Sequence, residues 1–206
     1  MGKVRNRLIL GAALLAGCAA LQGCGPGGGA GGANAVHSSG EALVGGPFQL
    51  VDQNDRPADQ TLLKGKWSAV FFGYTYCPDV CPTTLQALAQ AQDKLGDKAK
   101  NLQVVFISVD PERDTPAQVK TYLSTPAFPK GAIGLTGTSD QVAAVAKAYR
   151  VYFKKSGEGD GYSVSHSSIV YLMNPEGKFD RALTESQTPS EVATQIGDAM
   201  AGAGRG

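Results

Sequence analysis

The sequence has few residues that bind metals or form cross-links, with four cysteines and two histidines among 206 residues. Cys18 and Cys24 lie near the N-terminus, so the rest of the chain allows one internal disulfide and no disulfide framework. Surplus positive charge is also scarce, since the formal net charge is only +1. Nucleic-acid binding requires a basic footprint that this composition does not provide. We therefore expect no nucleic-acid partner.

The apolar run near the N-terminus is short. Leu8–Ala16 follows the basic residues Lys3, Arg5 and Arg7, which is the pattern of an export signal. A membrane-spanning helix needs about 20 apolar residues, and this run falls well below that length. The segment 1–17 is therefore predicted to be a signal peptide.

The end of this run contains a candidate lipidation site. Leu15–Cys18 resembles a bacterial lipobox, in which the cysteine is lipidated and becomes the mature N-terminus. Leu21–Cys24 is a poorer candidate, because Gln22 stands where the box prefers a small or apolar residue. A diacylated Cys18 would anchor the chain to a membrane, facing the periplasm or the cell exterior. The alternative is an uncleaved or ordinarily cleaved signal with two incidental cysteines.

The rest of the chain divides into a tether and one domain. Residues 18–46 are rich in glycine and poor in large apolar side chains, so they are predicted to be a flexible tether. Residues 47–203 are long enough for a single domain with a proper core. Without residues 1–17 the chain has 16 basic and 18 acidic residues, a formal charge of −2.

The domain shows alternating strand and helix patterns. Two apolar runs, 67–74 and 102–109, are typical of buried strands, and the region 167–183 predicts a hairpin. Helices are predicted over 82–95, 116–123, from 138 or 139 to 148, and from 189 onward. This order indicates an α/β fold with a mixed central sheet flanked by helices. A thioredoxin-like fold has this pattern, and it places a cysteine pair where the first central strand meets its helix.

Cys77 and Cys81 occupy that junction, four residues apart. A spacing of one helical turn would place both sulfurs on the same face of a helix. Free amides at a helix start favour the thiolate, which is both the nucleophile and the metal ligand. The pair is therefore equally consistent with a structural disulfide, a redox couple or part of a metal site.

His166 is the only histidine after residue 38. It precedes an apolar strand, where a lone histidine is more often a surface or core residue than a ligand. If the fold brings it to Cys77, however, the domain has a Cys₂His set. Two thiolates and an imidazole suit Cu(I), and also Cu(II) or zinc. Met173 lies about 23 Å farther along a strand, too far to be an axial ligand.

Three sequence blocks carry a resemblance to a known family. They are Phe72–Thr83 (FGYTYCPDVCPT), Ile107–Pro116 (ISVDPERDTP), and His166 with Tyr171–Phe179 (YLMNPEGKF). In this order and spacing they resemble the Sco/SenC family, and the similarity extends over about residues 45–200.

The resemblance implies a thioredoxin-like fold and a copper site formed by Cys77, Cys81 and His166. It also implies a role in maturing the binuclear copper centre of cytochrome c oxidase, with the copper-bearing subunit as partner. Asp110 would lie near the copper site and take part in metal binding or in contact with the partner. Its position at the end of a predicted strand suggests, by itself, a turn-forming role. Arg113 and Asp114 are interpreted as local salt-bridge and capping residues.

Two residues depart from the family pattern. Ser165 stands where an aspartate often precedes the histidine, and Asn174 replaces the hairpin aspartate. The first departure removes a possible partner of the imidazole, and such partners tune metal affinity. The three ligand positions are intact.

Two functions compete on these residues. The first is a monomeric, membrane-tethered copper chaperone that holds Cu(I), and also Cu(II), and passes it to the oxidase subunit. The second is a thiol–disulfide oxidoreductase in which Cys77 and Cys81 form a reversible disulfide and reduce the cysteines of the same client. Peroxidase activity is a third interpretation. A purely structural disulfide is a fourth, and it leaves the lone histidine unexplained.

Overall fold

The computed structural model describes residues 44–202. The predicted signal peptide, the lipidation at Cys18 or Cys24, and nearly all of the tether lie outside the described residues. The domain boundaries drawn from the sequence therefore stay predictions. Among the described residues, no helix is both long enough and apolar enough to cross a membrane.

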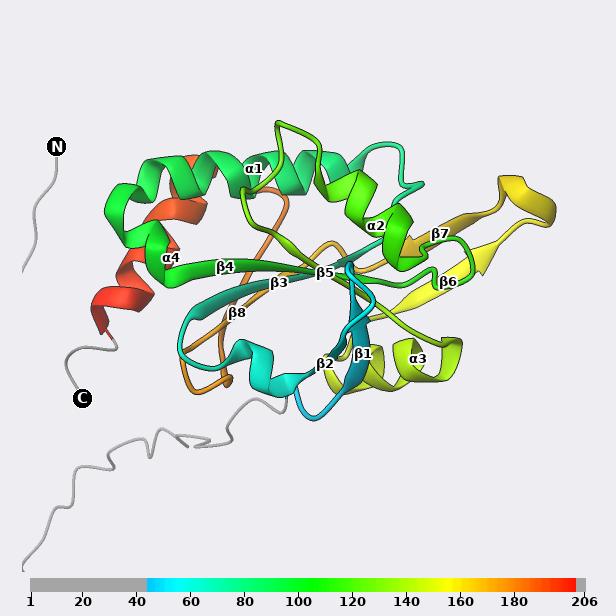
Figure 1. Cartoon of the computed structure of the whole chain (residues 1–206). Helices are drawn as coiled ribbons and strands as arrows, with labels where there is room; N and C mark the ends of the chain where they lie inside the picture. The colour runs from blue at the N-terminus through cyan, green and yellow to red at the C-terminus, as the bar shows by residue number, and fades with distance from the viewer. Residues whose placement is uncertain (1–43, 203–206) are drawn as a thin grey trace, which may run out of the picture. The chain divides into compact units, whose positions relative to one another are not determined.

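A seven-stranded mixed sheet forms the centre of the domain, in the order β2-β1-β5-β4-β3-β8-β9 (Figure 1). Three neighbouring strands run parallel: β3 (Trp67–Gly73), β4 (Leu102–Ser108) and β5 (Ile133–Thr136). The flanking strands pair antiparallel: β1 (Gln49–Asp52), β2 (Pro57–Asp59), β8 (Val170–Met173) and β9 (Phe179–Leu183). The sheet confirms the predicted α/β, thioredoxin-like architecture.

Helices flank this sheet on both faces. The α-helices of the described residues are α1 (Val80–Leu95), α2 (Pro116–Leu123), α3 (Ser139–Ala148) and α4 (Pro189–Gly202). In Figure 1, α1 and α2 lie on one side of the strands and α3 on the other, while α4 packs against α1. Three short 3₁₀ helices complete the described chain: Gln60–Leu63, Gly96–Asn101 and Gly159–Gly161.

The helix starts follow from local side chains. Thr115 caps α2, because its side chain accepts the N–H of Gln118 at 3.2 Å. Thr138 caps α3 in a capping box with Gln141, so the first of the two residues predicted for this cap is the right one. Helix α1 begins at Val80, two residues before the predicted start.

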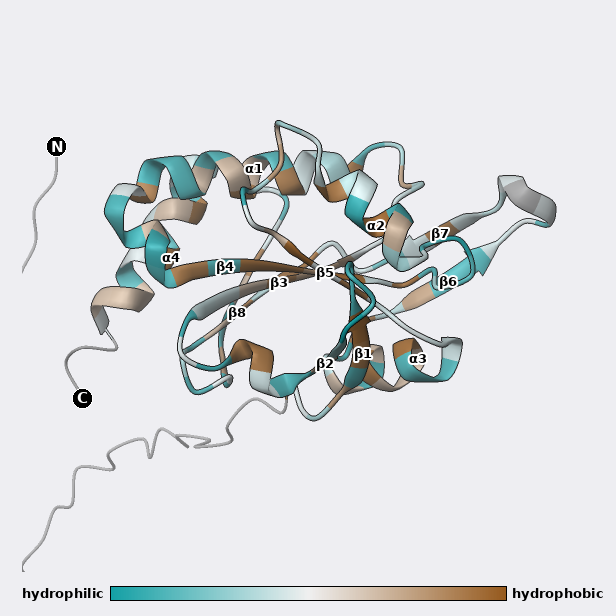
Figure 2. Cartoon of the chain, in the orientation of Figure 1, coloured by the Kyte–Doolittle hydropathy of each residue, from teal (hydrophilic) through white to brown (hydrophobic). Residues whose placement is uncertain are grey.

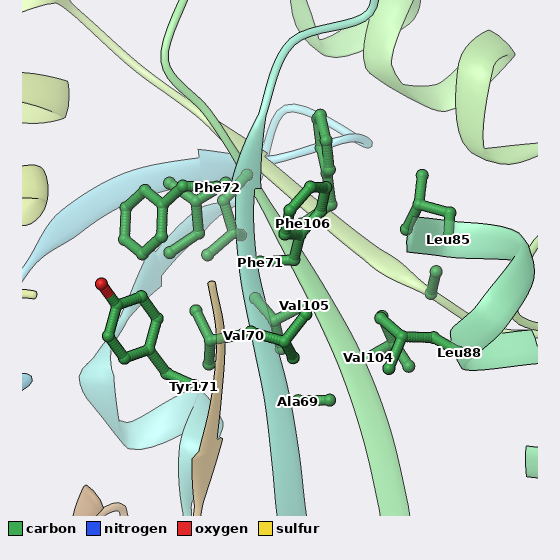
Figure 3. Packing of buried hydrophobic residues seen from close by; sticks show 14 of the residues in the cluster. Ala69, Val70, Phe71, Phe72, Leu85, Leu88, Val104, Val105, Phe106 and Tyr171 are labelled. Carbon is green, nitrogen blue, oxygen red and sulfur yellow. The ribbon is translucent and has the colours of Figure 1, made fainter. Parts of the chain in front are cut away.

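Every residue of β3 is buried, so both faces of this strand are covered. Successive side chains alternate between the faces (Figure 3). Phe71 packs against Phe106 on the side of α1, with ring centroids 6.3 Å apart. Phe72 packs against Tyr171 on the opposite side at 6.2 Å. Figure 2 shows mostly hydrophobic residues along β4 and β1, whereas the helices carry both hydrophobic and hydrophilic residues. The end of β3, which leads into the segment with Cys77 and Cys81, is therefore held by core packing.

The predicted order of elements omits three strands besides the short edge strand β2. One is β5, and the others are β6 (Phe153–Ser156) and β7 (Ser163–His166), which pair only with each other as a separate hairpin. In Figure 1 this hairpin extends beyond the central strands. His166 is the last residue of β7, so it comes from a hairpin outside the main sheet.

Candidate metal centre

The two cysteines lie where β3 gives way to α1, but the contact between them is not that of neighbours on one helical face. Cys77 lies in the loop before the helix, and Cys81 is the second residue of α1. The N–H of Cys81 points to the sulfur of Cys77 at 3.4 Å. First-turn amides lack partners within a helix, so Cys77 Sγ accepts one of them as a capping side chain would. The prediction of a same-face pair on a helix is therefore wrong in detail, although the sulfurs do meet.

Gly73 makes room for the buried cysteine at the end of β3. A Cβ atom at this position would lie 2.7 Å from the sulfur of Cys81 and 2.9 Å from the ring of Phe106. Real Cβ atoms do not approach other atoms so closely, so only glycine fits without a shift of its neighbours. Cys81 is fully buried as a result, whereas Cys77 is partly exposed.

Asp114 holds the loop that carries Cys77. Its carboxylate accepts the backbone N–H of Thr75 at 3.0 Å and the Thr75 hydroxyl at 2.7 Å. It also accepts the hydroxyl of Ser108 at 2.6 Å. Burial raises the pKa of Asp114, against the effect of these donors. The prediction that Asp114 is a capping residue is wrong, because Thr115 caps α2 and Asp114 points back toward the cysteine loop.

His166 turns its Nε2 atom toward the cysteines. Its Nδ1 lies 3.0 Å from the carbonyl oxygen of Ser167, which only accepts, so Nδ1 carries the proton. Nε2 is then the ring nitrogen available to a metal ion, and it lies 3.3 Å from the sulfur of Cys81. The ring contacts Tyr74 and Phe71 edge-on, with centroids 5.8 Å and 6.2 Å away.

The structure therefore brings the three predicted ligand positions together. The sulfurs of Cys77 and Cys81 and a ring nitrogen of His166 all lie within 4.8 Å of one another. Both cysteines are free thiols, so the predicted disulfide stays a prediction. A soft donor set of two sulfurs and one imidazole fits a copper ion, and it fits zinc as well.

The two thiols have opposite acid–base properties. The pKa of Cys77 is lowered to about 5, chiefly because the Cys81 thiol donates a hydrogen bond to it. The backbone N–H groups of Asp79 and Cys81 add to this effect, and burial opposes it. The pKa of Cys81 is raised, first by the same hydrogen bond to Cys77 and then by burial. Apo protein at neutral pH thus holds one thiolate and one thiol.

Asp110 lies outside the group of three. It is buried, and one carboxylate oxygen accepts the Tyr162 hydroxyl at 2.5 Å. The other oxygen accepts Nε of Arg113 at 2.6 Å, which confirms the local salt bridge predicted for Arg113. Asp110 also has the turn-forming role that its position suggests, since its carbonyl accepts the N–H groups of Arg113 and Asp114.

The two departures from the family pattern have structural explanations. Ser165 is exposed and pairs across the hairpin with Lys154, while the carbonyl of Ser167 orients the imidazole. Asn174 Oδ1 accepts the N–H groups of Glu176 and Lys178, so asparagine closes the β8–β9 turn. Neither departure removes a contact that the described site depends on.

Sequence reasoning did not single out Gly73, Tyr74 or Tyr162. Gly73 lies against Cys81 and Tyr74 against His166, while Tyr162 contacts Asp110 and Arg113. A glycine or tyrosine has no chemical signature of metal binding. Gly73 and Tyr74 belong to the first block that carries the family resemblance, Phe72–Thr83, and this membership is the signal that could have identified them. Tyr162 belongs to none of the three blocks.

Comparison with known proteins gives a consistent result. A family model described as SCO1/SenC matches residues 36–201. Protein SCO1 homolog 1, mitochondrial, of Arabidopsis thaliana is 45% identical over 144 residues, covering 69% of this chain and 42% of that protein. A putative copper-binding protein of Stutzerimonas stutzeri is 47% identical over 132 residues, covering 63% of this chain and 64% of that protein. The chain thus spans about half the length of such relatives.

Solved structures agree with these relatives. The structure of Bradyrhizobium japonicum ScoI with copper bound superposes with a TM-score of 0.68 at 44% identity, covering 75% of this chain and 98% of that one. Yeast Sco1 superposes with a TM-score of 0.72 at 39% identity, covering 78% and 99%. The likeness includes the mixed sheet and the helices that flank it. The chain belongs to the SCO1/SenC family.

Proposed function

We propose that the domain, residues 47–203, binds copper through Cys77, Cys81 and His166 and delivers it to the copper-bearing subunit of cytochrome c oxidase. The observation that carries this proposal is the convergence of two sulfurs and a ring nitrogen of His166 within 4.8 Å. The copper named for the Bradyrhizobium and Stutzerimonas relatives favours this metal over zinc. Copper is the cargo of the protein in this proposal.

Delivery would proceed by exchange of ligands. Cys77 and His166 are partly exposed, whereas Cys81 is fully buried. Acceptor ligands therefore approach from the side of Cys77 and His166, and Cys81 is the last donor that they can reach. Thiolate ligands favour Cu(I), and Cu(II) is a second state that the same donors accept.

The location of the protein completes the proposal. Export directed by residues 1–17, lipidation at Cys18 and the tether 18–46 would hold the domain, as a monomer, close to a membrane-embedded client. It would face the periplasm or the cell exterior. Cys24 is the alternative anchor. Labelling with a fatty-acid probe in cells, lost in Cys18→Ser and kept in Cys24→Ser, tests the choice.

A second function is favoured by the opposite acid–base properties of the two thiols. Cys77, with its pKa lowered to about 5, is a thiolate that can attack a client disulfide. The resulting mixed disulfide would be resolved by Cys81, giving a client dithiol and a Cys77–Cys81 disulfide. The two electrons that the client gains come from the two cysteine sulfurs. Cys81 supplies one proton and solvent supplies the other, because Cys77 attacks as a thiolate. This oxidoreductase role is compatible with the chaperone role, because only the dithiol form binds copper.

Anaerobic Cu(I) titration tests the proposed site. In a Cys18→Ser/Cys24→Ser background, the only thiols are those of Cys77 and Cys81. We expect one copper ion per chain, with an affinity at least about tenfold lower in Cys77→Ser, Cys81→Ser and His166→Ala. His37→Ala is the matched control, because His37 is the other histidine of the chain. Unchanged copper binding by His166→Ala would refute the three-ligand site.

Reduction of a disulfide in the isolated client domain separates the two functions. The oxidoreductase needs both cysteines and does not need the imidazole. His166→Ala should therefore keep reductase activity while it loses tight copper binding. Loss of both activities in His166→Ala would argue against an independent redox role.

A further inference from the structure

The candidate ligands come from two separately built parts of the domain. Cys77 and Cys81 belong to the junction of β3 and α1, but His166 ends the hairpin β6–β7, which has no strand pairing with the seven-stranded sheet. The backbone ladder therefore does not fix the distance from the imidazole to the sulfurs. Side-chain contacts between the hairpin and the main body must do so.

The strongest of these contacts centre on Arg113. Its guanidinium donates to Asp110 Oδ2 at 2.6 Å and to the carbonyl of Tyr162, on the hairpin, at 3.1 Å. Its Cζ lies 3.6 Å from the centroid of the Tyr162 ring, a close cation–π contact. The Tyr162 hydroxyl closes the set by donating to Asp110 Oδ1 at 2.5 Å. Charge-assisted hydrogen bonds between buried partners are the strongest class of such contacts.

The turn that carries Asp110 and Arg113 contacts both halves of the candidate metal centre. At its end, Asp114 holds the Cys77 loop through Thr75. Arg113 also lies 5.8 Å from the centroid of the Tyr74 ring, which contacts His166 edge-on. A single turn between β4 and α2 is thus fastened to the cysteine loop on one side and to the histidine hairpin on the other.

We propose that Asp110, Arg113 and Tyr162, the Arg113 clamp, position His166 against the cysteine pair and thereby set the metal affinity of the site. The clamp residues are positioning residues and not ligands. Both carboxylate oxygens of Asp110 accept hydrogen bonds within the clamp, and the side chain is buried. This inference rests on the proposed three-ligand site and adds to it the residues that hold the third ligand in place.

The hairpin offers a matched control. Lys155 joins it to the same turn through an ion pair with Glu112, at 2.5 Å. Both partners are about half exposed, and exposed ion pairs contribute little. Lys155 Nζ also lies 3.8 Å from the centroid of the Tyr162 ring, so the control is made on the other side of the ion pair. The control variant Glu112→Gln removes the ion pair and leaves the side chains that contact Tyr162 unchanged.

A double-mutant cycle with His166→Ala tests the clamp. Cu(I) dissociation constants are measured by competition with a chromophoric chelator, in the Cys18→Ser/Cys24→Ser background. We expect Arg113→Lys to weaken Cu(I) binding about tenfold, and Tyr162→Phe, which keeps the ring, about threefold. In the His166→Ala background both changes should have effects within about twofold, because no third ligand remains to be positioned. Glu112→Gln should stay within about twofold in either background.

X-ray absorption of the copper-loaded variants gives an independent readout, since loss of positioning removes nitrogen scattering and keeps both sulfurs. Equal losses of affinity in the two backgrounds would overturn the clamp, as would full affinity in Arg113→Lys and Tyr162→Phe. Equal copper binding by the parent protein and His166→Ala would instead refute the three-ligand site itself. The two failures are therefore distinguishable. Tyr162→Phe removes a single oxygen atom, so it keeps the test valid if Arg113→Lys does not fold.

Discussion

Cys81 and His166 belong to the same candidate metal centre, but they come from two regions of the domain that are stabilised in different ways. Cys81 is fully buried at the end of an entirely buried strand, with Gly73 and Phe106 against it. His166 ends a hairpin of mostly exposed polar residues that pairs only with itself. Core packing positions the cysteine, whereas a few side-chain contacts position the histidine. Substitutions in the first region should therefore alter folding, and substitutions in the second should alter binding.

The largest effect is expected from adding one carbon atom at the cysteine junction. Gly73→Ala forces its Cβ against the Cys81 sulfur and the Phe106 ring, so the free energy of unfolding should fall by about 1–3 kcal/mol. Gly161→Ala is the matched change in the hairpin, where a Cβ meets nothing within 4 Å. It should stay within about 0.5 kcal/mol. Urea unfolding of both variants checks the contrast, and equal losses would contradict it.

The difference between regions with local sequence signals and regions held by tertiary contacts also determines which parts of the fold can be predicted from the sequence. The parallel strands β3 and β4 are long apolar runs, and α2 and α3 begin at capping threonines, so each has a local signature. The short strand β5 has none. It includes Gly134, whose Cβ would lie 2.3 Å from Val119 Cγ1, so close packing against α2 excludes the larger residues that would indicate a strand.

The candidate site, too, could be predicted from the sequence only in part. The spacing of Cys77 and Cys81 is visible in the sequence, but the loop position of Cys77 is not. The hairpin β6–β7 reads as polar loop, since its strands contain Lys154, Lys155 and several serines. Tertiary contacts made by Tyr162 stabilise it there. The approach of His166 to the cysteines was accordingly an expectation from family resemblance, and only the structure supplies the contacts behind it.

The rate at which each cysteine reacts with an alkylating agent should differ between Cys77 and Cys81. In apo protein the alkylation rate of Cys77 should be nearly constant above about pH 6 and fall as the pH drops through about 5, because the thiolate is the reacting form. Cys81→Ala removes the main hydrogen bond to that thiolate, so the midpoint should rise toward the ordinary thiol range. His166→Ala removes a smaller contribution and should raise it less.

Iodoacetamide labelling followed by mass spectrometry between pH 4 and pH 9 measures these midpoints. Cys81, fully buried and with a raised pKa, should remain unlabelled while the domain is folded. A larger shift of the Cys77 midpoint in His166→Ala than in Cys81→Ala would contradict the prediction that Cys81 is the main hydrogen-bond partner of the Cys77 thiolate.

The smallest effect is expected at Ser165, beside the histidine. Neighbouring residues of a strand point to opposite faces, so a side chain at 165 projects away from the imidazole face. Ser165→Asp should therefore leave the Cu(I) dissociation constant within about twofold, while a carboxylate opposite Lys154 adds about 0.2–1 kcal/mol to stability. Copper binding about tenfold tighter would instead mean that the carboxylate reaches Nδ1 and displaces the Ser167 carbonyl as its partner. In that case a hairpin residue would tune the site by a direct hydrogen bond to the imidazole, in addition to the positioning by the Arg113 clamp.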